Sequence, residues 1–142
     1  MNIYKYVFFV FVFGIGLSHG QTTLTNNTPV VSHVKEQADI MGKAFLKGDY
    51  QSFTKYTYPA IVSSMGGESR MATVLANSAS SMKTQGMTFD NITFDSPSKI
   101  VKSGNELQCT LQQHTTIKLA NGRAVATSTL INANQRLSKK NN

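Results

Sequence analysis

The spacing of apolar residues changes once along this chain, at Gly86, and that change constrains the fold more than any other feature. From Val34 to Gly86 apolar side chains recur every three or four residues, as in helices with one buried face. After Gly86 they alternate with polar side chains, as in half-buried strands. Helices followed by antiparallel strands predict an α+β domain. We therefore expect N-terminal helices packed on one face of a curved antiparallel sheet.

Three helices are expected before Gly86. The clearest covers residues 34–47, with Ser32 as its N-cap. Its apolar stripe consists of Val34, Ala38, Met41 and Phe45. Asp49 is expected to cap a short second helix, and residues 60–65 to form one further turn. The last helix covers residues 68–85. Its expected stripe consists of Met71, Val74, Leu75, Ser78 and Met82.

The strand region predicts a hairpin. A first strand, 87–95, is expected to place Thr88, Asp90, Ile92 and Phe94 on one face. Residues 107–119 alternate over an unusually long strand, and Asn121-Gly122 is a strong hairpin signal. A two-residue loop would pair Ile117 with Ala126 on the returning strand, residues 123–133. If that strand is the last one, its outer edge invites pairing with a second copy, so a homodimer through the sheet edge is expected.

Residues 1–20 have the pattern of a secretion signal. A weakly basic start is followed by the apolar run Val7–Leu17 and by small residues before a cut at Gln21. The run is shorter than the roughly 20 residues that a spanning helix needs, so a retained membrane anchor is the second alternative. We expect export to the periplasm or the medium after cleavage near Gly20. The expected organisation is a signal peptide (1–20), a flexible polar lead-in (21–33), one domain (34–135) and a disordered basic tail (136–142).

The charge and the single cysteine exclude several classes of protein. The chain has 14 Lys and Arg against 7 Asp and Glu, but the basic residues are not interleaved with aromatic residues as in a nucleic-acid surface, so no nucleic-acid partner is expected. Cys109 is the only cysteine, which rules out an internal disulfide. It lies in an alternating strand, where a buried thiol acts as a small apolar side chain. No metal-ligand spacing and no cofactor motif is found.

One stretch of the chain resembles a known superfamily. The residues that carry the likeness are Gly48-Asp49-Tyr50, Phe53, Tyr56-Thr57-Tyr58-Pro59, Met65-Gly66-Gly67 and Met71. They resemble small exported bacterial proteins of the NTF2-like (cystatin-like) superfamily, over about residues 34–130. The resemblance implies a cone of helices wrapped by a bent sheet, with a pocket at its mouth. Such domains usually close with a long final strand, whereas here a polar, basic end follows Ile131. Either the sheet lacks that strand or the chain is a truncated version of a longer relative.

The candidate pocket residues are aromatic. They are Tyr50, Phe53, Tyr56 and Tyr58, which precede or surround Pro59. Superfamily enzymes commonly place a carboxylate or histidine inside the cone. Here Asp39 lies off the helix stripe, His33 precedes the first helix, and His114 lies on the strand face opposite Leu111 and Ile117. All three are expected at the surface, so no catalytic residue is assigned.

Two functions remain open. The first is a non-catalytic exported module that binds a small apolar or amphipathic ligand, or a protein partner. The alternative is an NTF2-like enzyme that transfers protons on a small molecule, as isomerases and dehydratases of the superfamily do. The lack of an acid or base on any expected inward stripe favours the first function over the second.

Overall fold

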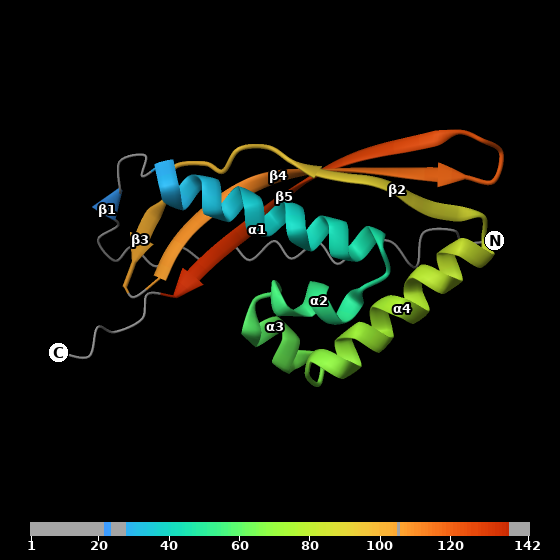
Figure 1. Ribbon diagram of the computed structural model, residues 1–142, viewed down its shortest axis with the longest axis horizontal. Coiled ribbons are helices and arrows are strands. Elements are labelled where there is room, and N and C mark those ends of the chain that lie inside the picture. Colours follow the sequence, from blue (N-terminus) through green and yellow to red (C-terminus); the bar gives the residue numbers. More distant parts are fainter. Residues whose placement is uncertain (1–21, 24–27, 105, 137–142) are drawn as a thin grey trace.

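A computed structural model describes residues 22–23, 28–104 and 106–136. In chain order the elements are β1 (Thr22–Thr23), α1 (Thr28–Leu46), α2 (Tyr50–Lys55), α3 (Pro59–Ser64), α4 (Glu68–Thr84), β2 (Met87–Phe94), β3 (Val101–Ser103), β4 (Glu106–Leu119) and β5 (Ala124–Arg136). The predicted α+β class is confirmed, with helices followed by a curved antiparallel sheet (Figure 1). The predicted signal, residues 1–20, and residues 137–142 of the predicted disordered tail lie outside the described residues. Arg136, the first residue of that predicted tail, instead ends β5, so the predicted boundary is wrong there.

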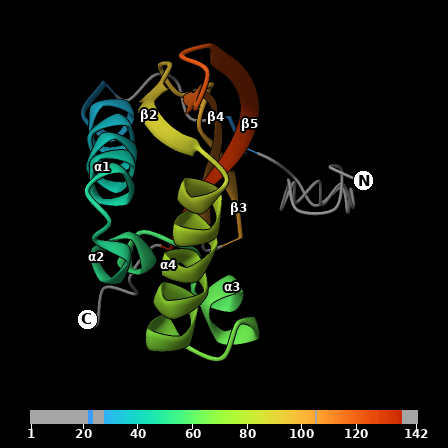
Figure 2. The ribbon, with the colours of Figure 1, turned by 90° about the vertical axis from the view of Figure 1, so that its right-hand side faces the viewer.

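β4 is the central strand of the sheet. One of its edges pairs with β2 and β3, and the other pairs with β5 along thirteen consecutive residue pairs, from Glu106 with Arg136 to Lys118 with Ala124. The helices lie on one side of the sheet (Figure 2). We call the sheet face toward the helices the inner face and the opposite face the outer face. Within the part of the chain that the structure describes, the far edge of β5 pairs with no strand.

α1 begins earlier than predicted. It starts at Thr28, six residues before Val34, so Ser32 lies inside the helix and the predicted flexible lead-in is wrong from residue 28 onward. Proline is well tolerated in the first turn, where its missing N–H has no helical partner, so Pro29 does not prevent this start. Val30 and Val31 then pack against the core, which explains why the helix includes them. β1, which pairs with β3, also falls within the predicted lead-in.

The short helices follow the predicted local signals. The Asp49 carboxylate accepts a hydrogen bond from the Ser52 N–H at 3.0 Å and caps α2, as predicted. Hydrogen bonds from the Ser52 side chain and from its backbone N–H lower the pKa of Asp49. Pro59 starts α3 at its first residue instead of only ending the preceding segment. Gly86 follows α4 with a φ of +77°, a conformation that favours glycine, and β2 begins directly after it.

β2 departs from the predicted alternation because it contains an irregularity. The register against β4 shifts between Phe89 and Asn91, at Asp90. Phe89 pairs with Ile117, whereas Ile92 pairs with Thr115. The extra residue brings residues on both sides of it onto the inner face, which strict alternation would not allow. The prediction that Thr88 and Asp90 share one face with Ile92 is therefore wrong.

The hairpin of β4 and β5 forms, but its register differs by one residue from the prediction. Ile117 pairs with Val125, not with Ala126, because the loop has three residues instead of two. The Leu119 N–H donates to the Arg123 carbonyl at 2.8 Å, and Gly122 has a φ of +78°. A turn followed by a glycine in the left-handed region is the usual three-residue hairpin. One residue of shift moves a side chain to the other face, so Ala126 lies on the outer face.

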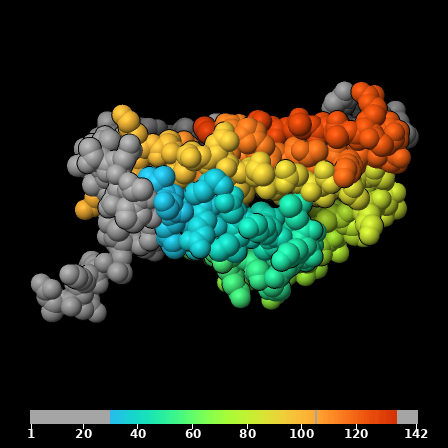
Figure 3. All heavy atoms as spheres, turned by 45° about the horizontal axis from the view of Figure 1, so that its top comes forward, coloured from blue at the N-terminus to red at the C-terminus, as the bar shows by residue number. Residues whose placement is uncertain are grey.

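The core lies between α1 and the inner face. Its buried members are Ala38, Phe94, Ile100, Cys109 and Leu111. α1 approaches β2 closely: a Cβ on Gly42 would lie 3.0 Å from Cε2 of Phe94. Figure 3 shows α1 running alongside β2. The predicted α1 stripe is confirmed, since Val34 and Met41 pack on this core and Phe45 contacts Phe89 of β2.

The predicted stripe of α4 is wrong in part. Met71 is buried, and Leu75 and Met82 are half-buried, as predicted. Val74 and Ser78 are exposed, and the buried neighbour of Met71 is Ala72. α4 packs against α2 and β2, and its buried side includes the small Ala72 instead of the larger Val74.

Candidate functional site

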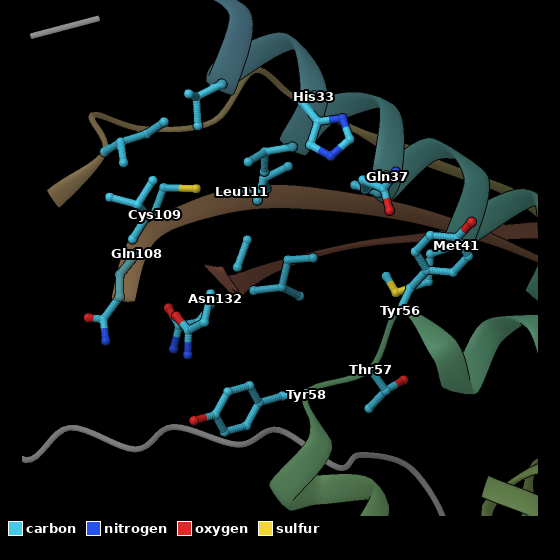
Figure 4. Close-up of a pocket in the computed structure, with 18 of the residues that line it drawn as sticks. His33, Gln37, Met41, Tyr56, Thr57, Tyr58, Gln108, Cys109, Leu111 and Asn132 are labelled. Atoms are coloured by element: carbon cyan, nitrogen blue, oxygen red, sulfur yellow. The ribbon is translucent and has the colours of Figure 1, made fainter. Parts of the chain in front are cut away.

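A pocket of about 410 Å³ opens between α1, the segment joining α2 to α3, and the inner face of β4 and β5. Small-molecule pockets generally have volumes of about 300–1,000 Å³, so this one suits a compact ligand. Figure 4 shows His33, Gln37 and Met41 on the α1 side, with Tyr56 and Tyr58 facing them from the joining segment. The apolar lining residues are Val30, Val34, Ala38, Met41, Pro59, Ile100, Leu107, Cys109, Leu111, Ile131 and Ala133.

The structure divides the four aromatic candidates into two pairs. Tyr56 and Tyr58 line the pocket, each 37% exposed. Tyr50 and Phe53 do not line it: each contacts the ring of Phe45 edge-on, with ring centres 5.4 Å apart. Burial raises the pKa of Tyr50. With Phe89, whose ring centre lies 4.9 Å from that of Phe45, they form what we call the aromatic cluster.

The polar groups of the pocket are mostly amides. Gln37 lines it from α1, together with His33 and with Lys55 of α2. Gln108, Asn132 and Asn134 line it at the end of the hairpin away from the turn, from strand positions that alternate with those of the inner face. None of the described lining residues is Asp or Glu. The Tyr58 hydroxyl lies 3.3 Å from Oε1 of Glu106 and donates to it, which places one carboxylate behind the rim. Composition alone did not indicate these amides, because Gln and Asn occur throughout the chain.

Cys109 is a buried part of the pocket wall. Its side chain is 7% exposed, as the alternation of β4 predicts, and burial raises the pKa of its thiol. A raised pKa keeps the sulfur protonated, and the protonated thiol is a poor nucleophile. Cys109 therefore serves as an apolar wall residue.

The histidines and Asp39 lie in different places. Asp39 forms an ion pair with Lys35 at 2.6 Å on the surface of α1. His33, expected before the first helix, lies within α1, is exposed and contributes to the pocket lining. His114 lies on the outer face, away from the pocket, as expected.

His114 joins two side chains that the sequence did not single out. Its Nε2 lies 3.0 Å from Oδ2 of Asp95, and its Nδ1 lies 2.8 Å from the Ser128 hydroxyl. The contact with Ser128 follows from direct pairing of the two residues across β4 and β5. These are the residue types of an acyl-transfer triad, but His114 and Asp95 are 43% and 61% exposed on the outer face, and neither they nor Ser128 line the pocket. We interpret them as a link that ties β2 and β5 to β4.

Metal binding and membrane crossing find no support in the described residues. No three His, Cys, Asp or Glu side chains there are grouped as a metal ion would require. No described helix combines the length and apolar character needed to cross a membrane.

Comparison with known proteins adds no relative. No family model matches the chain. No curated protein matches it. The NTF2-like resemblance therefore stays a prediction, and the function has to be argued from the pocket itself.

Proposed function

We propose that this protein is a non-catalytic module that binds a small amphipathic ligand, with the apolar part of the ligand in the pocket. The observation that carries the proposal is a hollow of about 410 Å³ at one end of the apolar core, with amide side chains in its lining. Apolar walls with a few placed polar groups are typical of small-molecule sites. A concave pocket suits a small ligand better than it suits the flat surface of another protein. The sequence left a protein partner open as well, and the pocket therefore favours the small ligand.

The charges of the lining suggest the polar end of the ligand. Lys55 and His33 contribute to the pocket, and the described lining includes no carboxylate. A neutral or negatively charged end group would meet donors from the amides and, from Lys55, a positive charge. A positively charged end group would find no opposite charge among the lining residues.

The enzymatic alternative finds less support. Proton transfer needs an acid or base within hydrogen-bond reach of the substrate. His33 is the histidine of the lining, but the described lining includes no Asp or Glu to pair with it, and the pair of Asp95 with His114 lies on the outer face. Cys109, inside the pocket, has a raised pKa that keeps it protonated at neutral pH.

A fluorescent probe tests the proposal. 1-Anilinonaphthalene-8-sulfonate carries an apolar ring system and one negative charge, and we expect it to bind the wild type saturably. Ala133→Leu should fill the pocket and weaken probe binding about tenfold, which corresponds to about 1.4 kcal/mol. Ala124→Leu is the matched control, because Ala124 is an exposed residue of the same strand on the outer face. Equal binding by the two folded variants would contradict the proposal.

We further propose that the module works outside the cytoplasm, on the strength of the signal pattern in residues 1–20. Mass spectrometry of the cell envelope and medium should find a chain that begins at Gln21. A dominant cytoplasmic species that retains Met1 would contradict export.

A further inference from the structure

We propose that β5 pairs with β5 of a second copy of this chain, antiparallel and centred on Ser128, to give a closed dimer with one continuous sheet. The observation behind this is the edge itself. β5 is 13 residues long and, within the described part of the chain, pairs along one edge only. Open edges of this length are templates for another strand.

The backbone groups available at that edge follow from the register. The Leu119 N–H donates to the Arg123 carbonyl, and the pairing of β4 with β5 continues without a shift. Residues of an antiparallel pair alternate between bonding to the partner strand and pointing away from it. Odd-numbered residues of β5 therefore bond to β4, and even-numbered residues present their N–H and C=O groups at the open edge.

β5 lacks the usual protection of an edge strand. Natural edges carry charged residues, prolines or irregularities that prevent pairing. From Ala124 to Gln135 this strand has no charged residue and no proline, and its register against β4 has no bulge. Two copies laid side by side would therefore bring no like charges opposite each other.

Exposed apolar side chains gather on the same strand. Leu130 is 63% exposed and Val125 is 44% exposed, the two highest values among the large apolar residues that the structure describes as exposed. They lie on opposite faces of the sheet, so no single helix or loop would cover both. A strand added at the edge places side chains on both faces of the sheet, beside Val125 on one face and Leu130 on the other. We therefore infer that the partner at this edge is a strand.

The side chains select the register. In an antiparallel pair centred on Ser128, Val125 lies opposite Ile131 of the partner subunit on the inner face, and Ala126 lies opposite Leu130 of the partner subunit on the outer face. Each contact occurs twice by symmetry. Centring the pair on Leu130 would instead place Val125 opposite a glutamine. Matched apolar pairs across strands stabilise a sheet, so the register at Ser128 is favoured.

A proline at an edge position tests the pairing. The chain is expressed from its own start, purified as the host processes it, and measured by sedimentation equilibrium. We expect the mass of two chains, because each β5 has one open edge and the pairing occupies it. Ala126→Pro removes an outward N–H and spares the bonds to β4, so it should weaken the dimer about tenfold or more while the circular dichroism is retained. Ala126→Ser, which keeps the N–H, is the matched control and should stay dimeric.

A cross-link tests the register independently of the proline. In a Cys109→Ala background, Thr127→Cys combined with Thr129→Cys places the two thiols opposite each other across the axis, and oxidation should give covalent dimers. Thr127→Cys with Ala133→Cys, opposite each other only if the axis lies at Leu130, should give none. A monomeric wild type, a dimer unaffected by Ala126→Pro in a folded variant, or the reverse cross-linking pattern would overturn the proposal. None of these outcomes depends on ligand binding.

Discussion

The space between the helices and the inner face has two ends, and they are packed differently. At one end the aromatic cluster of Phe45, Tyr50, Phe53 and Phe89 fills the space with edge-on ring contacts. At the other end Tyr56 and Tyr58 stand at the rim of a hollow of about 410 Å³.

The tyrosines at the two ends come from one short segment of the chain, residues 50–58. Tyr50 is the first residue of α2, and its ring contacts Phe45. Tyr56 follows Lys55, the last residue of α2, and lies at the rim of the pocket. The comparison shows that an aromatic run does not define a site. Part of it stabilises the fold, and part of it is left for a ligand.

The largest expected difference between the ends is in stability. Phe45→Ala should lower the free energy of unfolding by about 3 kcal/mol, because it removes the ring that the other three aromatic residues contact. Tyr56→Ala should cost less than about 1 kcal/mol, because that side chain is already 37% exposed. Urea denaturation measures both. Similar losses for the two variants would show that the rim is as tightly packed as the cluster.

The contributions of the two ends to stability should also be lost at different pH values. Burial raises the pKa of Cys109 at the pocket and of Tyr50 in the cluster, so the folded protein keeps both protons to higher pH than the unfolded chain. Stability from Cys109 is therefore present below about pH 8.5 and falls above it, and stability from Tyr50 falls above about pH 10.

Urea midpoints between pH 7 and pH 11 measure this effect. Cys109→Ala should remove the first decline, and Tyr50→Phe should remove the second. A first decline that persists in Cys109→Ala would mean that another group is responsible.

The smallest expected effect concerns the charge at the pocket. Lys55→Gln should weaken binding of the anionic probe by about two- to fivefold at low salt, as expected for an exposed charge, and the difference should shrink as salt is added. Fluorescence titration at two salt concentrations measures it. Lys47→Gln, on an exposed residue outside the pocket, is the control and should leave probe binding unchanged. Equal effects of the two substitutions would show that Lys55 has no specific role in binding the probe.

The candidate site could be predicted only in part. The aromatic segment before Pro59 correctly indicated two residues that line the pocket, Tyr56 and Tyr58. Ile131 and Asn132 line it as well, but they come from a strand more than seventy residues further along the chain, and no local pattern connects them to α1. The link from Asp95 through His114 to Ser128 escaped prediction for the same reason, since it depends on the register of three strands.

The sequence by itself determined which elements form and in what order. The change of spacing at Gly86, the cap at Asp49 and the turn at Asn121-Gly122 are local signals, and each acts through hydrogen bonds and backbone conformations within a few residues. Such signals need no knowledge of the rest of the chain.

The tertiary structure decided which face each element presents. The irregularity at Asp90 and the three-residue hairpin loop each shift a strand face by a single residue, and α4 buries Ala72 instead of Val74. Two adjacent faces differ little in local free energy, so contacts with distant elements select between them. The pocket and the open edge of β5 depend on those selections, which is why neither could be located before the elements were packed together.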